Sequence, residues 1–168
     1  MSKNVVLIGM PASGKSTIGV LLAKILNKGF VDTDILMQSK YGKSLKDIIS
    51  EDGIYEFKTR EKDTIMSIDT DNSVIATGGS AVYSKNAMEH LKKNSVFVYI
   101  YVPYCYIKER IESLEERGVL LEEDRTLSEL YDSRQYLYEK YADITINAKA
   151  RSVEDLLKEI IEKTRDLD

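Results

Sequence analysis

The feature that most limits the possible folds is the segment GMPASGKST at residues 9–17. It fits the pattern G-x4-G-K-[ST], and it lies between a short apolar run at residues 4–8 and a helical pattern. Gly9 and Gly14 let the backbone curl so that successive amides point at a phosphate, and the positive end of the following helix faces the same point. A glycine-rich turn that fits by chance is the alternative. The flanking strand and helix favour a phosphate-binding loop.

The loop assigns nucleotide and metal contacts to particular residues. We expect Lys15 to reach the β and γ phosphates of ATP, and the Ser16 hydroxyl to bind Mg²⁺. The cofactors expected from the loop are therefore ATP and Mg²⁺. The predicted nucleotide-binding residues of the loop are Gly9, Ala12, Ser13, Gly14, Lys15, Ser16 and Thr17.

Short apolar runs alternate with helical patterns along the chain. Runs typical of strands buried on both faces cover residues 4–8, 30–32, 74–77, 96–102 and 144–147. Between them, apolar residues recur at i, i+3, i+4 and i+7, as in the stripes that begin at Ile18 and Val153. Thr126 and Ser152 are predicted helix caps. This order predicts a single domain over residues 1–168 with a three-layer α/β/α fold and a central five-stranded parallel sheet, whose ligands bind beyond the carboxyl ends of the strands.

Composition argues against several classes of function. The net charge is −4 with both signs scattered, which gives no basic field for nucleic acid. A single cysteine, Cys105, and a single histidine, His90, predict neither an internal disulfide nor a zinc site. No apolar run approaches the roughly 20 residues of a membrane span, and the first run is too short for a signal peptide. We expect a cytoplasmic protein, and a monomer because no apolar helix face is left over.

Two acids end the second apolar run, which reads FVDTD at residues 30–34. Because the second strand of a doubly wound sheet ends near the first loop, Asp32 and Asp34 are expected where the γ phosphate would lie. Their i, i+2 spacing in an extended segment places both on one face. A carboxylate there can hold a magnesium-bound water, accept a hydroxyl proton or bind substrate. The alternative is a solvated turn that caps a helix beginning near Ile35.

Other residues are expected at the same edge. Gly78 and Gly79 follow the third run and allow backbone to approach a ligand, although a tight turn needs them equally. Arg134 lies within the apolar stripe of a helix over residues 126–141, so it points inward and needs a partner, either a bound anion or a structural ion pair. Arg117 opens the segment RGVLLEED, where it could close over the γ phosphate or stand as an ordinary basic residue at a helix end.

Together these segments resemble the shikimate kinase family over nearly the whole chain. GMPASGKST is similar to the phosphate loop of that family, FVDTD to its D-x-D strand end, and TGGSA at residues 77–81 to its glycine motif. Arg117 and the leucines after it resemble the family lid, here about residues 112–125. Arg134 and the residues after it resemble the R-x-P-x-Y-x-x-x-A-D segment. Arg110 resembles the position at which the family stacks a basic side chain on adenine.

The resemblance implies an activity and a role for each residue. The family transfers the γ phosphate of ATP to a ring hydroxyl of shikimate, giving shikimate 3-phosphate in the pathway to aromatic amino acids. By resemblance, Asp34 binds substrate hydroxyls, Asp32 lies near Mg²⁺ and the attacking hydroxyl, and Arg134 grips the substrate carboxylate. The substrate-binding helices are expected over about residues 33–62. The predicted catalytic residues are Lys15, Asp32, Asp34 and Arg117.

Most departures from the family lie on the acceptor side. The family segment G-E-x-x-F-R-x-x-E stands here as GIYEFKTRE at residues 53–61, so Lys58 replaces an arginine and loses its planar fork. Arg60 is turned about 200° away on the helix, and Glu61 is placed to orient or pair with Lys58. Ser80 replaces the third glycine of the glycine motif. The expected acceptor-binding residues are Asp34, Lys58, Gly78, Gly79, Ser80 and Arg134.

These observations leave three readings of the function. The first is a shikimate kinase. The second is a kinase on the same scaffold that acts on another small hydroxylated acid, an amino alcohol or a sugar, as the changes at Lys58 and Ser80 would allow. The third is a nucleotide-dependent switch or binding module, which the phosphate loop alone permits. The paired acids and the inward Arg134 favour a small-molecule kinase over this last reading.

Overall fold

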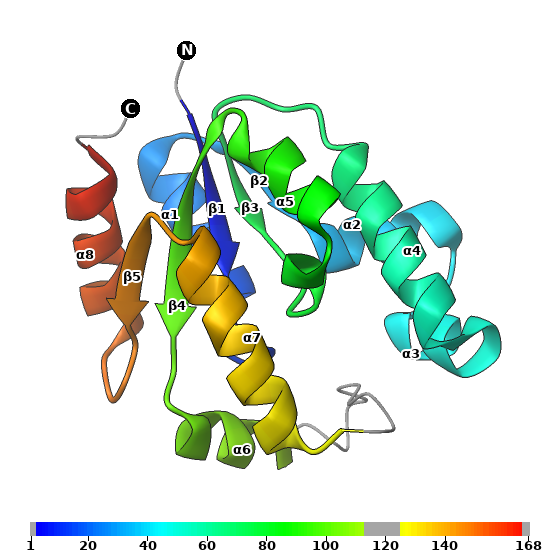
Figure 1. The fold of residues 1–168 in the computed structure, drawn as a ribbon. Helices are drawn as coiled ribbons and strands as arrows, with labels where there is room; N and C mark the ends of the chain where they lie inside the picture. The colour runs from blue at the N-terminus through cyan, green and yellow to red at the C-terminus, as the bar shows by residue number, and fades with distance from the viewer. Residues whose placement is uncertain (1–2, 113–124, 166–168) are drawn as a thin grey trace.

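The computed structural model describes residues 3–112 and 125–165, in which strands and helices alternate (Figure 1). The strands are β1 (Asn4–Ile8), β2 (Gly29–Asp32), β3 (Ser73–Ala76), β4 (Ser95–Tyr101) and β5 (Ile144–Asn147). The α-helices are α1 (Lys15–Leu26), α2 (Thr33–Tyr41), α3 (Leu45–Asp47), α4 (Gly53–Met66), α5 (Lys85–Lys92), α6 (Tyr104–Glu112), α7 (Leu127–Tyr141) and α8 (Val153–Arg165). A π-helical segment, η1 (Ile48–Asp52), joins α3 to α4, and a 3₁₀ turn, η2 (Ala81–Tyr83), precedes α5.

All five strands form one parallel sheet with the order β2-β3-β1-β4-β5. The predicted three-layer fold is confirmed, because α8 packs against α1 on one face while α5 and α7 cover the other (Figure 1). The carboxyl ends of parallel strands meet at one edge, which is the lower edge in Figure 1. Since β1 is the middle strand, the loop after it lies at the centre of that edge.

Burial of the strands depends on their place in the sheet. Every residue of β1 and β3 is buried, as the apolar runs predicted. The edge strand β5 instead alternates buried and exposed residues, and β2, at the other edge, is exposed or half-buried throughout. The prediction of strands buried on both faces is therefore wrong for β2 and β5, because an edge strand has a sheet neighbour on one side only and less helix cover.

Helices α2, α3 and α4 form a group beside the β2 edge of the sheet (Figure 1). The group has a small core of its own, formed by Met37, Ile48 and Phe57. Its position places the inner side of α4 opposite the carboxyl ends of the strands. The helical region expected over about residues 33–62 lies within this group.

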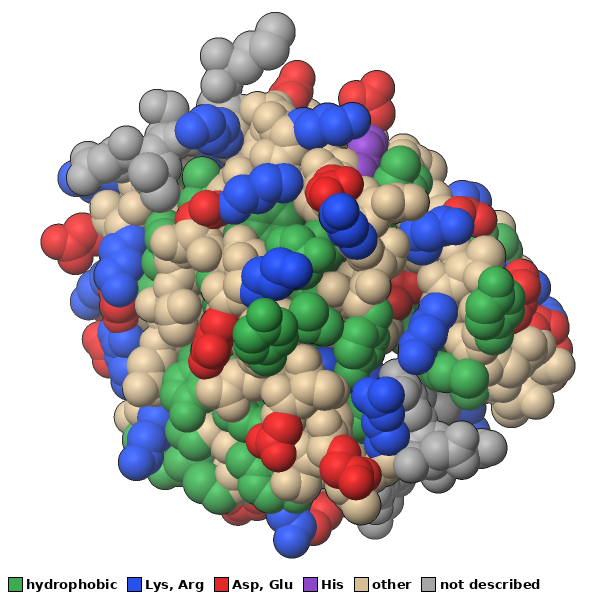
Figure 2. All heavy atoms as spheres, viewed as in Figure 1, with side chains coloured by type: hydrophobic (Ala, Val, Ile, Leu, Met, Phe, Trp, Pro, Cys, Tyr) green, Lys and Arg blue, Asp and Glu red, His purple; other side chains and the backbone are tan. Residues whose placement is uncertain are grey.

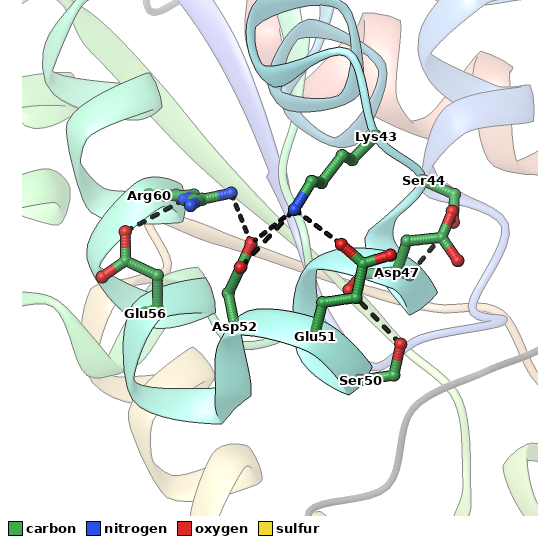
Figure 3. A network of polar contacts seen from close by, with 8 residues as sticks. All are labelled: Lys43, Ser44, Asp47, Ser50, Glu51, Asp52, Glu56 and Arg60. Carbon is green, nitrogen blue, oxygen red and sulfur yellow. Dashed lines mark hydrogen bonds and ion pairs between the residues drawn. The ribbon is translucent and has the colours of Figure 1, made fainter.

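A network of ion pairs holds the outer end of the α2–α4 group together (Figure 3). Lys43 Nζ is 2.7 Å from Glu51 Oε2 and 3.2 Å from Asp52 Oδ2. Arg60 Nη1 is 2.9 Å from the same Asp52 oxygen, and Arg60 Nε donates to Glu56 Oε1 at 3.0 Å. Asp52, the last residue of η1, thus links the loop after α2 to α4. Arg60 points into this network, as helical geometry predicts for a residue two positions from Lys58.

The surface agrees with the scattered charges of the sequence. Basic and acidic side chains are interspersed over the face shown in Figure 2. Over residues 3–112 and 125–165, no helix combines the length and the apolar character needed to cross a membrane.

Candidate active site

The loop between β1 and α1 curls at the centre of the carboxyl edge. Gly14 caps α1 with φ of 92°, a left-handed conformation that glycine adopts at little cost. Lys15 turns back over the loop, where its Nζ donates to the carbonyl oxygens of Gly9 at 2.9 Å and Met10 at 2.7 Å. It also donates to Ser13 Oγ at 3.3 Å. The ammonium group is therefore held over the concave side of the loop, where a phosphate is expected.

Burial of Lys15 changes its acid–base properties. Burial lowers the pKa of the ammonium group to about 8, and the negative charges of Asp34 and then Asp32 oppose that effect. A partly desolvated cation of this kind gains strongly from an additional anion nearby. Phosphate oxygens bound in the loop would supply that anion and would keep Lys15 protonated.

Asp32 connects the phosphate loop to α2. Its Oδ2 accepts a hydrogen bond from Ser16 Oγ at 2.6 Å, so the two predicted magnesium ligands are adjacent. Its Oδ1 accepts from the backbone N–H groups of Asp34 at 3.0 Å and Ile35 at 3.2 Å, which makes Asp32 the N-cap of α2. The carboxylate therefore combines both sequence interpretations, because it caps the next helix and also faces the loop.

Asp34 lies in a helix and not in an extended segment. Helix α2 begins at Thr33, so the prediction that extended backbone places Asp32 and Asp34 on one face is wrong. The physical reason is the Asp32 cap, which lets helical backbone begin directly after β2. Thr33 Oγ1 accepts a hydrogen bond from Gly78 N at 3.0 Å, which ties the start of α2 to the turn after β3.

A cavity of about 380 Å³ lies between the phosphate loop, the turn after β3 and the α2–α4 group. It brings together most of the residues predicted from the loop, the acids, the glycines and the inward arginine. Apolar side chains from α3, η1 and α4 cover its outer side. The lining residues are Pro11, Ala12, Gly14, Lys15, Ser16, Thr17, Asp34, Leu45, Ile49, Ile54, Phe57, Glu61, Thr77, Gly78, Gly79, Ser80 and Arg134.

Two carboxylates approach each other at Gly78. A Cβ atom on Gly78 would lie 2.5 Å from Glu61 Oε1 and 2.8 Å from Asp34 Oδ1, so no larger residue fits there without a shift. Burial is the main cause that raises the pKa of Asp34 to about 6, and the negative charge of Asp32 raises it further. Burial likewise raises the pKa of Glu61 to about 7. The floor of the cavity thus carries two carboxyl groups whose pKa values lie close to neutral pH.

Arg134 lies on the inner face of α7, as predicted, and is only 4% exposed. Its guanidinium lies 5.4 Å from the ring centroid of Tyr83, and its Nε donates to the Tyr83 hydroxyl at 3.3 Å. Tyr138, one turn later, donates to the carbonyl oxygen of Gly79 at 2.6 Å and so fixes α7 against the glycine turn. Arg134 therefore provides a fixed cation at the cavity wall.

Lys58 and Ser80 occupy the wall on the α4 side. Lys58 Nζ lies over the ring of Tyr83, 5.2 Å from its centroid, and Lys58 lines an adjoining cavity of about 200 Å³. Glu61 and Ser80 line both cavities, and Ser80 Oγ donates to Glu61 Oε2 at 2.6 Å. The positive charge of Lys58 also lowers the pKa of Glu61, so the expected pairing of the two residues stays a prediction. The bond from Ser80 is an additional contact, which exists because Ser80 supplies a hydroxyl where the family has glycine.

The remaining predicted nucleotide contacts lie beside the loop or outside the described residues. Arg110, near the end of α6, donates through Nη1 to the carbonyl oxygen of Ala12 at 3.0 Å. This contact places it next to the phosphate loop, and its stacking on adenine stays a prediction. Arg117, with nearly all of the predicted lid at about residues 112–125, lies outside the described residues.

Sequence reasoning considered Glu61 only as a partner of Lys58, and it missed Tyr83. Glu61 is 5% exposed and lies on the buried stripe of α4 with Phe57 and Ile65. A charged residue on an apolar stripe is the signal that identified Arg134, and it would have identified Glu61 as well. Tyr83, which contacts both Arg134 and Lys58, gave no such signal, because its role depends on the position of η2 relative to α4 and α7.

The oxygen donors next to the loop fit a magnesium ion that also binds phosphates. Mg²⁺ prefers oxygen ligands and often takes only one or two from the protein. Ser16 Oγ and the Asp32 carboxylate supply two such oxygens side by side. Within residues 3–112 and 125–165 no group of three or more acidic, histidine or cysteine side chains could hold a metal by itself.

Comparison with known proteins places the chain. A family model described as shikimate kinase matches residues 11–165. A shikimate kinase of Clostridium botulinum (strain 657 / Type Ba4) is 41% identical over 150 residues, which are 86% of this chain and 88% of the relative. A shikimate kinase of Sulfurihydrogenibium sp. (strain YO3AOP1) is 33% identical over 164 residues, with 97% and 98% covered.

Solved structures agree with these sequence matches. The shikimate kinase from Acinetobacter baumannii, in complex with shikimate, has a TM-score of 0.89 and 29% sequence identity to this chain. The alignment covers 100% of this chain and 96% of that one. The parallel sheet, the phosphate loop and the family match over almost the whole length lead to one conclusion: this chain belongs to the shikimate kinase family.

Proposed function

We propose that the protein transfers the γ phosphate of ATP to a hydroxyl of shikimate, giving shikimate 3-phosphate. One observation carries the proposal: a single cavity is lined by Lys15 of the phosphate loop, by the Asp34 carboxylate and by the buried Arg134. A phosphate donor, a hydroxyl and a carboxylate each find a matching group there. Family membership supports the same assignment.

The proposed roles follow from the position of each side chain. Lys15 would neutralise the β and γ phosphates, and Arg110, beside the loop, would contact the nucleotide. Asp34, with a pKa of about 6, is mainly ionised at neutral pH and would accept a hydrogen bond from the attacking hydroxyl. Arg134 would bind the acceptor carboxylate, with the glycine turn at Gly78 and Gly79 beneath it.

Mg²⁺, when bound, would be held by Ser16 and Asp32 and would offset the charge on the phosphates. The protein groups around it would align the reacting atoms and exclude water, which can account for most of the rate in phosphoryl transfer. Arg117 and the lid belong to this proposal as the element that closes over the nucleotide. We further propose that the protein acts as a monomer in the cytoplasm.

A second acceptor class is kept because of the placement of Lys58. Its ammonium group lies over the ring of Tyr83 in the adjoining cavity. Where the family's arginine would give the acceptor carboxylate a second two-bond contact, this chain therefore offers a point charge farther out. This arrangement would suit another small hydroxylated acid, an amino alcohol or a sugar. A nucleotide switch without a small-molecule acceptor would give no role to the cavity that Asp34, Gly79 and Arg134 line.

An ADP-release assay with magnesium ATP tests the proposal. Shikimate would be compared with small hydroxylated acids, amino alcohols and sugars, and the phosphorylated product would be identified by mass spectrometry. We expect shikimate to give a kcat/KM on the order of 10⁴ M⁻¹s⁻¹ or more. If another compound is phosphorylated and shikimate is not, the protein is a kinase of the second acceptor class. If ATP is hydrolysed and no phosphorylated small molecule forms, the protein is a nucleotide switch.

A further inference from the structure

The two oxygens of the Glu61 carboxylate have different surroundings. Glu61 is 5% exposed, and its Oε2 accepts a hydrogen bond from Ser80 Oγ at 2.6 Å. Its Oε1 is buried and has no hydrogen-bond partner within residues 3–112 and 125–165. A buried carboxylate oxygen without a partner is costly, so a ligand that donates a hydrogen bond to it would be favoured.

The unpartnered oxygen lies beside Gly78, which lines the acceptor cavity together with Glu61. The position of a Cβ atom on Gly78 would be 2.5 Å from Glu61 Oε1 and 2.8 Å from Asp34 Oδ1. Two carboxylate oxygens, from α4 and from α2, therefore lie close together against Gly78, and all three residues line the cavity. Adjacent hydroxyl groups on one ring are the ligand chemistry that such a pair suits.

Ser80 is the group that most favours the ionised form of Glu61. Burial raises the pKa of Glu61 to about 7, and the negative charge of Asp34 raises it as well. The hydrogen bond from Ser80 lowers it more than do the positive charges of Arg134 on α7 and Lys58 on α4. A short bond to one oxygen also fixes the rotation of the carboxylate, and so fixes where the other oxygen points.

We propose that Ser80 is a positioning residue that holds Glu61 with Oε1 directed at an acceptor hydroxyl, beside Asp34. The proposal rests on the proposed function, because it describes how this chain holds the acceptor of that reaction. It assigns to a serine hydroxyl a direct orienting contact with Glu61, in addition to the positive charge of Lys58 that acts on the same carboxylate. Ser80 is thus a determinant of acceptor affinity that acts through Glu61.

Two pairs of variants test this role in the intact enzyme. Ser80→Ala removes the hydroxyl, and Ser80→Thr keeps it and is the matched control. We expect KM for shikimate to rise about five- to tenfold in Ser80→Ala, as for loss of a hydrogen bond to a charged group, with kcat within threefold and KM for ATP unchanged. Ser80→Thr should stay within about twofold of the parent. In a Glu61→Gln background the same Ser80→Ala change should alter KM less than twofold.

The titration of Glu61 gives a readout that needs no acceptor. In protein labelled with ¹³C at the glutamate carboxyl carbon, with Glu61→Gln used for assignment, the Glu61 resonance should titrate at higher pH in Ser80→Ala than in the parent. Ser80→Gly, which also lacks the hydroxyl, should behave the same way and replaces Ser80→Ala if that variant folds poorly.

Some results would overturn the role of Ser80, and others would overturn the function beneath it. Two results would show that Ser80 does not act through Glu61. One is a Glu61 resonance that titrates at the same pH in Ser80→Ala as in the parent. The other is a Ser80→Ala change that raises KM for shikimate as much in the Glu61→Gln background as in the parent. A parent enzyme that leaves shikimate untouched would remove the proposed function, while the titration would still decide whether Ser80 orients Glu61.

Discussion

The nucleotide half and the acceptor half of the site are built in different ways. In the nucleotide half, Lys15 binds carbonyl groups of its own loop, and Ser16 bonds to Asp32 at the end of β2. In the acceptor half, Asp34, Glu61 and Arg134 come from three different helices, α2, α4 and α7. A short motif therefore specifies the first half, whereas the second depends on how separate helices pack. The predictions below test this contrast.

The largest effect is expected in the nucleotide half. Lys15→Ala removes the preorganised cation, so kcat/KM should fall by about 10³-fold or more, with the fold retained. Steady-state kinetics measures the loss, and circular dichroism checks the fold. Lys24→Ala, an exposed lysine on the same helix, is the control and should leave both unchanged. A loss below tenfold in Lys15→Ala would place the phosphates elsewhere.

A smaller and selective effect is expected from Arg134. Arg134→Lys keeps the charge and loses the fork, so KM for shikimate should rise roughly 30- to 100-fold, as expected for loss of a bidentate contact. KM for ATP should change less than about threefold if the halves are separate. Arg151→Lys, on the surface near α8, is the matched control. Equal increases in both KM values would contradict the separation.

The two roles of Asp32 can be divided by a pair of variants. Asn is as good an N-cap as Asp, so Asp32→Asn should keep the free energy of unfolding within about 0.5 kcal/mol of the parent. The Mg²⁺ concentration for half-maximal activity should rise about tenfold, since a carboxylate ligand is lost. Asp32→Ala should also lose about 1 kcal/mol of stability through the cap. Denaturant unfolding and Mg²⁺ titration measure these effects, and an unchanged Mg²⁺ requirement would contradict the metal role.

Asp34, in the acceptor half, should lower the free energy of unfolding of the protein without bound ligands. Burial raises the pKa of Asp34 from 3.8 to about 6, so between these values the unfolded chain releases a proton that the folded chain keeps. The contribution of Asp34 to stability therefore falls as pH rises through this window and stays low above it. Asp34→Asn should raise the free energy of unfolding by about 1–2 kcal/mol at pH 8 and leave it unchanged near pH 3.5. Urea unfolding at both pH values tests this, and a gain that does not depend on pH would exclude titration as its cause.

The smallest effect on acceptor binding is expected from the ion-pair network in Figure 3. Arg60→Ala removes contacts to Asp52 and Glu56 at the outer end of the α2–α4 group. Partly exposed pairs of this kind contribute little, so the unfolding midpoint should fall slightly, and less at high salt. KM for shikimate should change less than about twofold. A large rise in KM would mean that the network shapes the cavity.

The sequence predicts the nucleotide half of the site better than the acceptor half. Gly14 and Lys15 could be placed because the loop is contiguous and its neighbours are the strand and helix that a phosphate loop needs. Arg134 could be placed because a cation interrupts an apolar stripe. A helix that begins near Ile35 was only the alternative to an extended segment, and α2 in fact begins at Thr33, because the Asp32 carboxylate both caps the helix and faces the loop. The bond between Ser80 and Glu61 was missed because it depends on how α4 packs beside the glycine turn.

The most direct test compares shikimate with the same ring compound in which the carboxylate is an amide. Both would be assayed as phosphoryl acceptors under the same magnesium ATP conditions. We predict that shikimate is phosphorylated with a kcat/KM at least about 100-fold above that of the amide, because the amide lacks the charge and the second oxygen that a buried Arg134 binds. Equal rates for the two compounds, or no turnover of shikimate, would contradict the account of the acceptor half.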